Sequence, residues 1–346
     1  MEFPTAVDER MQNDVDAAKA RAVMRRLWDR LRLNRFVVLG RVGMDLYADP
    51  PGTRIEEATR FTTAIGGSAG NIAVALARQG AQVALLSAVS DDAVGRYCVA
   101  QLQGYGVDCT PTRAVAGEAR NSLAVTETRA KGCQVVLYRN GAADFDLSHG
   151  QVTAVDFTPV AALIITGTAL AAEPSRAVTF AAIAAARAAG ALVVLDIDYR
   201  AYSWPSIAEA IEVCGAAASA SDIVIGNDDE FGLLAGDVAK GQDYARHLAA
   251  SAIFCVYKQG ASGSVTFTPD FHFRTGIFAV TAQKPMGAGD GFMGGLMAGL
   301  VQGQTLDAAV RRGSATAAMI VAGIACAPAS PNTADLDHFM ENTQCT

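Results

Sequence analysis

Short apolar segments alternate with Ala-rich segments along most of the chain. From residue 35 onward, near-continuous apolar and often β-branched runs are typical of strands that are buried on both faces of a sheet. The Ala-rich stretches between them end near a glycine or a polar turn, as helices do. We expect strands at 36–40, 83–89, 162–167, 191–197, 222–226 and 253–258, and helices at 72–80, 176–190 and 208–218. This alternation predicts an α/β fold with a parallel sheet covered on both faces.

Two segments, 45–63 and 119–139, show polar–apolar alternation instead, and the second contains the turn-like pair Lys131-Gly132. They are expected to form a small exposed sheet beside the main one. Open α/β sheets bind ligands at the carboxyl ends of their strands, so such a sheet is placed to act as a lid. The predicted organisation is a helical arm (1–33), a main domain (34–340) and a short tail (341–346).

Composition and charge exclude several classes of protein. With 51% hydrophobic and 18% charged residues among 346, the chain is not disordered. The net charge of −7 comes without basic clusters, so no nucleic-acid partner is expected. Seven scattered cysteines without C-x-x-C spacing predict free thiols and no zinc site. The acidic N-terminus has no apolar core, so we expect a cytoplasmic protein without a membrane partner.

The most informative segment is 284–300, KPMGAGDGFMGGLMAGL. Gly287, Ala288 and Gly289 form a small turn, and Asp290 then opens a Gly/Ala-rich helix. Backbone N–H groups of such a turn and of a helix N-terminus favour an anion. A carboxylate beside this anion hole can accept the proton of an attacking hydroxyl. The alternative is that Asp290 only caps the helix.

A second glycine turn runs into a helix at 66–80, GGSAGNIAVALARQG. Gly66 and Gly67 let the backbone approach a ligand closely, and the amide of Asn71 can bond hydroxyl groups. The spacing G-x-G-x-x-G is absent, which argues against a dinucleotide site.

Together the two segments resemble the two signatures of the PfkB (ribokinase-like) carbohydrate kinase family. The first matches the family's G-G-x-x-x-N helix, and the second its G-A-G-D anion hole. Three further motifs follow the family's order, and the resemblance covers about residues 35–340. It implies a ribokinase-like three-layer α/β/α fold with a mainly parallel sheet and a small β lid. It also implies ATP-dependent phosphorylation of a sugar, with Asp290 as the catalytic base.

The three further motifs imply roles for six residues. Asp45 matches the family's Asp near the first strand, which binds sugar hydroxyls. Gly66, Gly67 and Asn71 are expected to bind substrate with it. Asn227 and Glu230 match the N-x-x-E motif, which organises phosphate and magnesium, here with Glu230 acting through bound water. Lys258, Gly260 and Gly263 match the G-x-x-G nucleotide loop. Taken alone, the acidic string at 227–230 also fits a solvated helix start, and Lys258 fits an exposed strand end.

Two arginines suggest the substrate class. Arg139 in 138–144 (YRNGAAD) and Arg200 in 196–200 (DIDYR) lie where family members bring residues over the sugar. An Arg fork pairs with the two oxygens of a carboxylate, so both predict a sugar acid. The strings look like those of acid-sugar kinases, with 5-dehydro-2-deoxygluconate as the expected substrate. The alternatives are 2-keto-3-deoxygluconate, a neutral sugar such as fructose or ribose, and arginines that form structural ion pairs or touch ATP phosphates.

Lys284 departs from the family's usual D-T-T-G-A-G-D, in which the first Asp contributes to a monovalent-cation site. This substitution argues against potassium activation, and the Lys284 ammonium is a candidate to replace the ion. The expected cofactors are ATP and Mg²⁺, and a homodimer through the lid is a candidate assembly.

Two other classes of protein fit the sequence less well. A sugar- or nucleotide-sensing protein on the same fold would be indicated by loss of the base or of the anion hole, but both are intact. A nicotinamide dehydrogenase would carry the motif G-x-G-x-x-G after the first strand, but this chain has the sequence GRVGMD there.

Overall fold

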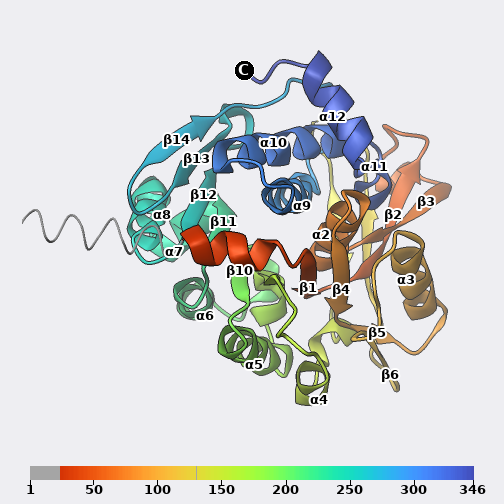
Figure 1. Cartoon of the computed structure of the whole chain (residues 1–346). Helices are drawn as coiled ribbons and strands as arrows, with labels where there is room; N and C mark the ends of the chain where they lie inside the picture. Colours follow the sequence, from red (N-terminus) through yellow and green to blue (C-terminus); the bar gives the residue numbers. More distant parts are fainter. Residues whose placement is uncertain (1–23, 130) are drawn as a thin grey trace, which may run out of the picture.

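The computed structural model describes residues 24–129 and 131–346, and a twisted sheet runs through its centre (Figure 1). Within these residues the sheet has eight strands in the order β14-β13-β12-β11-β10-β9-β1-β4. All neighbours from β12 to β4 are parallel, and β13 and β14 add an antiparallel edge. The strands are β1 (Arg35–Leu39), β4 (Gln82–Leu86), β9 (Ala162–Thr166), β10 (Leu192–Asp196), β11 (Ile223–Asn227), β12 (Phe254–Lys258), β13 (Ser264–Phe267) and β14 (His272–Thr275).

The sequence predicts six of these eight strands; β13 and β14 were not expected, and one predicted strand has a different form. The segment 83–89 does not form one strand, because it divides into β4 and β5 (Ala88–Ser90). β5 leaves the main sheet and pairs with β6 (Arg113–Val115).

Helices cover both faces of the main sheet, as the alternation of apolar segments predicts. One face packs against the helix at 24–31, α2 (Ser68–Arg78), α3 (Ala93–Gly104), α9 (Ala288–Val301) and α10 (Leu306–Ala322). The other packs against α4 (His149–Thr153), α5 (Ser175–Ala188), α6 (Ile207–Ser219), α7 (Asp228–Ala235) and α8 (Gly241–Ala249). Short α11 (Cys326–Ala329) and α12 (Thr333–Asn342) follow α10. In the described ranges, no helix is both long and apolar enough to cross a membrane.

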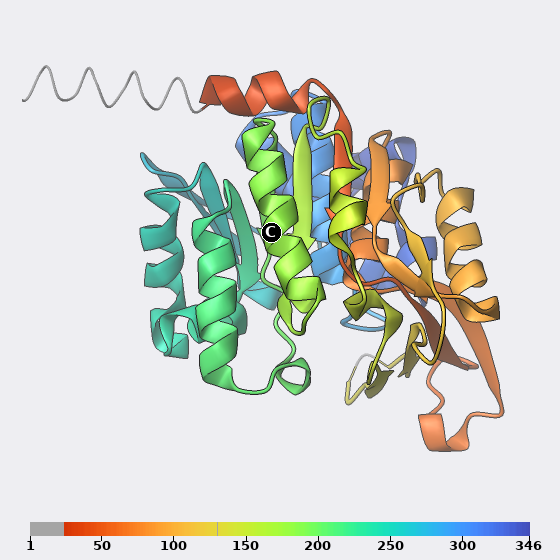
Figure 2. The same cartoon turned by 90° about the horizontal axis from the view of Figure 1, so that it is seen from below.

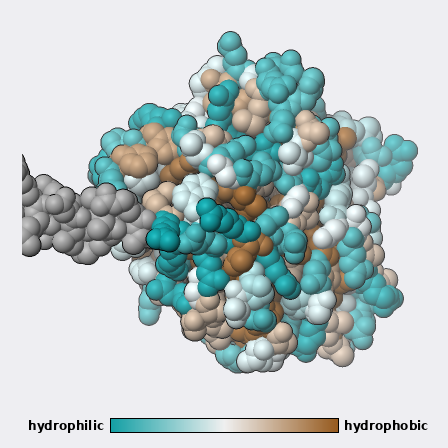
Figure 3. Space-filling model, viewed as in Figure 1, coloured by the Kyte–Doolittle hydropathy of each residue, from teal (hydrophilic) through white to brown (hydrophobic). Residues whose placement is uncertain are grey.

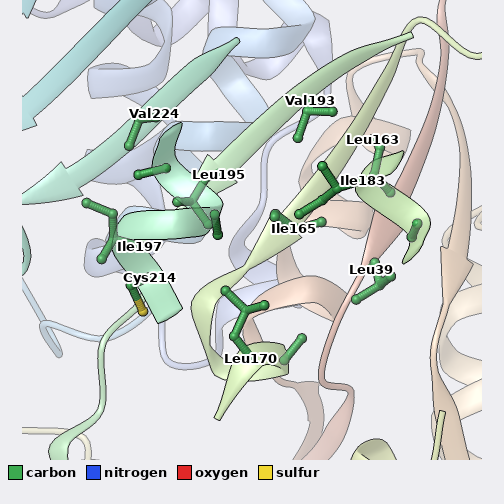
Figure 4. Close-up of a cluster of buried hydrophobic side chains, with 14 of the residues drawn as sticks. Leu39, Leu163, Ile165, Leu170, Ile183, Val193, Leu195, Ile197, Cys214 and Val224 are labelled. Carbon is green, nitrogen blue, oxygen red and sulfur yellow. The ribbon is translucent and has the colours of Figure 1, made fainter. Parts of the chain in front are cut away.

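Strand residues alternate between the two cores because successive side chains of a strand point to opposite faces. Val37 and Leu39 of β1 belong to the core under α5 and α6, whereas Phe36 and Val38 belong to the core under α2 and α9. Figure 4 shows the first of these cores, in which side chains of β1, β9, β10 and β11 meet Ile183 of α5 and Cys214 of α6. This packing holds the carboxyl ends of the parallel strands in fixed positions.

A four-stranded sheet projects from one side of the main sheet and forms the lid (Figure 2). Its order is β3-β2-β7-β8, with β2 and β7 parallel and the two outer pairs antiparallel. The strands are β2 (Gly43–Asp49), β3 (Arg60–Gly66), β7 (Ser122–Thr126) and β8 (Val135–Tyr138), and they come from the two segments with alternating polarity. Three residues separate β1 from β2, so the base of the lid lies directly beside the carboxyl end of β1.

The described residues near each end of the chain pack against or hydrogen-bond to the main domain. In the predicted arm, residues 1–23 lie outside the described residues, and Leu27 and Leu31 of the following helix are buried in the core. In the predicted tail, Thr346 exchanges two backbone hydrogen bonds with Ile277. Figure 3 shows a mainly hydrophilic face with apolar groups in small separate areas.

Candidate active site

A cavity of about 850 Å³ lies at the carboxyl ends of the parallel strands, under the lid. Each of the parallel strands β10, β11 and β12 ends in a polar residue that lines it, namely Asp196, Asn227 and Lys258. The predicted site residues that line the cavity are Asp45, Gly67, Asn71, Arg139, Arg200, Asn227, Glu230, Lys258, Gly260, Gly263, Lys284, Gly287, Ala288, Gly289 and Asp290. The fold therefore brings together residues that lie more than 200 positions apart in the sequence.

Asp290 lies in the first turn of α9 and contacts the other glycine motif directly. Its Oδ2 accepts a hydrogen bond of 2.8 Å from Nδ2 of Asn71, in the first turns of α2. Burial, with Asp198 and Asp196 nearby, raises the pKa of Asp290 to about 7, although Asn71 and Arg200 act in the opposite direction. A carboxylate with this pKa is suited to accept a proton near neutral pH. Oδ1 of Asn71 is buried without a protein partner among the described residues, which leaves it available to a ligand hydroxyl.

The turn before Asp290 can be built only with glycine at its first position. Gly287 has a φ of 80° and caps α9, and a Cβ there would collide with Sγ of Cys326. The first N–H groups of a helix have no intrahelical acceptor. The turn at 287–289 and the start of α9 therefore present free donors to the cavity. The second glycine turn is equally restricted, because a Cβ on Gly66 would collide with the carboxylate of Asp45.

Four carboxyl groups gather next to this turn, and we call Asp196, Asp198, Glu230 and Asp290 the acid cluster. Two cations balance it. Lys258 Nζ lies 3.9 Å from Asp196, and Arg200 Nη2 lies 2.7 Å from Asp198. Asp198 has a φ of 37°, which is uncommon for a residue other than glycine, and its Oδ2 accepts a hydrogen bond from Thr168.

Glu230 is buried, so the acidic string at 227–230 is more than a solvated helix start. One carboxylate oxygen, Oε2, accepts the backbone N–H of Asn227 at 2.7 Å, and Oδ1 of Asn227 accepts the N–H of Glu230. This capping box fixes the start of α7. The other oxygen, Oε1, has Arg200 Nη1 at 3.9 Å and is free for a hydrated cation. Burial raises the pKa of Glu230, against the effect of Lys258.

Lys258 ends β12 and points into the cavity rather than into solvent, since its side chain is only 17% exposed. A Cβ on Gly289 would lie 3.1 Å from its Nζ, so the ammonium is next to the anion-hole turn. Burial acts to lower the pKa of Lys258, but Asp196, Glu230 and Asp290 together raise it. The lysine is therefore charged. Gly260 and Gly263, both at positive φ, form the turn that follows.

Lys284 is fully buried and bonds the segment that leads to the anion hole. Its Nζ donates to the carbonyl oxygens of Met286 at 2.8 Å and Ile320 at 3.4 Å, and to Sγ of Cys326 at 3.3 Å. Tyr47 connects the same thiol to Asp45, because its hydroxyl lies 3.7 Å from Sγ and donates to Asp45 Oδ2 at 3.0 Å. Burial raises the pKa of Asp45.

The two arginines predicted to bind substrate both line the cavity, but each already has an acid partner. Arg139 is buried and donates through Nε and Nη2 to Asp144, and Nη2 also donates to the carbonyl of Thr168. The structural ion pair considered from the sequence is therefore present. One nitrogen, Nη1, is buried without a partner in the described part of the chain. Arg200 is paired with Asp198, which raises the pKa of its guanidinium.

Several residues of the cavity were not singled out from the sequence. Asp196 and Asp198 belong to the quoted 196–200 string, and two acids at the end of a buried strand are a signal that could have identified them. Thr168, Tyr47 and Arg41 also line the cavity. Ordinary strand and turn composition gives no sign of these three, since their placement depends on how the lid meets the main sheet.

The fold and this site define a carbohydrate kinase. Residues 33–333 match the family model described as pfkB family carbohydrate kinase, and the chain belongs to that family. The fold class expected from the sequence is confirmed by solved structures with the same fold. A fructokinase from Vibrio cholerae, solved with fructose, ADP and potassium ion, is 26% identical with a TM-score of 0.78, and the match covers 88% of this chain and 98% of that one.

Two curated relatives are more similar in sequence, and both are named as kinases of one sugar acid. A 5-dehydro-2-deoxygluconokinase from Photobacterium profundum is 40% identical over 314 residues, covering 89% of this chain and 95% of the relative. The 5-dehydro-2-deoxygluconokinase 1 of Bacillus cereus is 34% identical over 318 residues, with the same shares covered.

Proposed function

We propose that the protein phosphorylates the terminal hydroxyl of 5-dehydro-2-deoxygluconate with ATP and gives the 6-phosphate, a step of myo-inositol catabolism. The observation that carries this proposal is the contact between Asn71 and Asp290, which joins the sugar motif to the catalytic motif beside an anion hole. The relatives named for this substrate support the choice of sugar acid. A kinase for 2-keto-3-deoxygluconate or for a neutral sugar is the alternative.

In the proposed mechanism, Asp290 accepts the proton of the attacking hydroxyl, and Asn71 holds the hydroxyl beside it. The N–H groups at 287–289 bind the oxygens of the phosphoryl group as it is transferred. Asp45, Gly66 and Gly67 hold the remaining hydroxyls at the base of the lid. General-base catalysis of this kind contributes about 10²–10⁴-fold to the rate.

ATP fits the other half of the cavity. The segment 277–280 and apolar side chains of α10 line a wall that suits an adenine ring, and the loop at 260–263 borders it. Asn227 and Lys258 line the same cavity, and Lys258 Nζ is next to Gly289 of the anion hole. Lys258 is placed to contact the β- and γ-phosphates.

The donor set also fits a hydrated Mg²⁺. Mg²⁺ keeps several waters and is commonly held by one or two carboxylates together with substrate phosphates. Oε1 of Glu230 is the oxygen of that residue not used in the helix cap, and it would bind the ion through water. When bound with ATP, the ion would neutralise phosphate charge.

The Lys284 ammonium already bonds two carbonyl oxygens and a thiol, which leaves no role there for a potassium ion. We therefore propose that the enzyme is independent of potassium.

Exposed apolar side chains on the outer lid strand, Val135, Val136 and Tyr138, support a homodimer through the lid. Seven free cysteines support a cytoplasmic location.

The test is to incubate the purified enzyme with MgATP and 5-dehydro-2-deoxygluconate and to follow the product by ³¹P NMR. A phosphomonoester on C6, formed in equal amount to ADP, is expected. ADP release without a sugar phosphate, or phosphorylation at another carbon, would contradict the proposal.

A further inference from the structure

Arg41 is a cavity residue that forms no salt bridge with the described residues. It follows β1 at the base of the lid and lines the same cavity as Arg139 and Arg200. Those two arginines carry acid partners at 2.5 Å and 2.7 Å. Among the described residues, no carboxylate oxygen lies within 4.0 Å of the Arg41 guanidinium, although Asp45 is near enough for the guanidinium to act against the burial that raises the pKa of Asp45.

The Arg41 side chain is nevertheless held in place. Its backbone carbonyl accepts the N–H of Gly70 in α2, and its Nη1 donates to Oγ of the buried Ser122 at 2.9 Å. A Cβ on Gly43 would lie 3.2 Å from Nη1, so this glycine leaves room for the arginine. An arginine has five N–H donors, and in the described ranges one of them is used here. The guanidinium of this cavity-lining residue is thus held in place, and four of its donors have no acceptor among the described residues.

Ser122 also brings Arg41 close to Arg139. β7 and β8 pair with Leu123 opposite Tyr138, so Arg139, the next residue, leaves the sheet beside Ser122. The unpartnered Nη1 of Arg139 is therefore at the same end of the lid as Arg41. Arg200 is located differently, because it faces Asp198 and Glu230 of the acid cluster.

From this arrangement we infer that Arg41 binds the carboxylate of the sugar acid and selects acids over neutral sugars, with Nη1 of Arg139 as a second donor. This inference rests on the proposed function. An open six-carbon chain spans about 6–7 Å, so its carboxylate and its phosphorylated hydroxyl need separate partners. Arg41 serves the first and Asp290 the second. A planar fork without a competing acid suits a carboxylate better than a hydroxyl.

The test compares kcat/KM for 5-dehydro-2-deoxygluconate and for its neutral C1 amide in Arg41→Met and wild type. Charged hydrogen bonds contribute about 1.5–3 kcal/mol, so the variant should lose about 10- to 150-fold on the acid. It should lose little on the amide, and the KM for ATP should stay nearly constant. Arg41→Lys, which keeps the charge but not the fork, should lie between, and Ser122→Ala should show a smaller loss in the same direction.

The matched control is Arg60→Met, which removes the same charge from an exposed arginine of lid strand β3. It should leave the acid-to-amide ratio unchanged. Equal losses on acid and amide in both Arg41 variants would overturn the inference and leave the proposed function standing. Wild-type enzyme without a preference for the acid over the amide would also overturn the inference, whereas wild-type enzyme that does not phosphorylate the acid would overturn the proposed function.

Discussion

Asn71 and Asp290 are 219 positions apart in the sequence, and they share a hydrogen bond of 2.8 Å. The helices that carry them, α2 and α9, approach closely because Gly294 faces Ala75, and a Cβ on that glycine would collide with the alanine. Packing of small residues therefore sets the distance between the group that holds the acceptor hydroxyl and the group that takes its proton.

The first prediction concerns Asp290→Asn. The variant keeps the shape of the side chain and an oxygen that can accept the Asn71 hydrogen bond, but it removes the basic oxygen. We expect kcat to fall by about 10²–10⁴-fold with little change in the KM for ATP. Steady-state kinetics on protein shown by circular dichroism to be folded checks this. Turnover close to that of wild type would exclude Asp290 as the base.

The second prediction is the pH dependence of activity. Since the pKa of Asp290 is raised to about 7, the base is protonated below neutral pH in the free enzyme. A plot of kcat/KM against pH should therefore fall by about tenfold per unit below pH 7. A profile that stays flat down to pH 5 would contradict the role of this carboxyl.

The same pKa predicts a change in stability. The folded state holds a proton on Asp290 between its usual pKa of 3.8 and about 7, where the unfolded state has lost it. The free energy of unfolding therefore decreases as pH rises through this window. Asp290→Asn should gain Tm relative to wild type at pH 8 but not at pH 4, by on the order of 2 °C. Thermal unfolding at both pH values measures this, and an equal Tm difference at the two would count against the assignment.

The third prediction concerns magnesium. Glu230→Gln can still accept the backbone hydrogen bond that caps α7, but it loses the charge on the oxygen that faces the cavity. The magnesium concentration for half-maximal activity should rise several-fold at fixed ATP. Asp229→Asn, in the same helix turn and exposed, is the matched control and should leave the titration unchanged. Superimposable curves for Glu230→Gln and wild type would exclude the role.

The fourth prediction is independence from potassium. The Lys284 ammonium bonds the carbonyl oxygens of Met286 and Ile320 permanently, so no exchangeable ion is needed there. Activity at constant ionic strength should agree within about twofold in KCl, NaCl and tetramethylammonium chloride. A strong and specific activation by KCl would show that an ion binds in addition to the lysine.

The parallel strands of the main sheet, several of the helices that cover it and the two glycine turns could be predicted from the sequence because each depends on local pattern, whereas β13 and β14 were not expected. The prediction of a single strand at 83–89 was wrong, because the division into β4 and β5 depends on the pairing of β5 with β6, which is distant in the sequence. The positions of Asp290, Glu230 and Lys258 at strand ends and helix starts were likewise readable from their motifs.

The partners of charged side chains could not be predicted in this way. Arg139 follows a strand with alternating polarity, and nothing local indicates that Asp144 folds back to pair with it. Arg41 stands in an unremarkable turn, and its open guanidinium is visible only once Ser122 and the lid are in place. Ion pairs between segments depend on tertiary packing. The sequence alone therefore identifies candidate cationic side chains, but it does not show which of them already have an acidic partner.

The measurement that tests the central claim most directly is ADP release by wild-type enzyme over a panel of acceptors. The panel contains 5-dehydro-2-deoxygluconate, 2-keto-3-deoxygluconate, fructose and ribose, each over a full concentration range with MgATP. We predict that 5-dehydro-2-deoxygluconate has the highest kcat/KM, at least tenfold above either neutral sugar. A higher kcat/KM for fructose or ribose than for both acids would contradict the account and make the protein a neutral-sugar kinase.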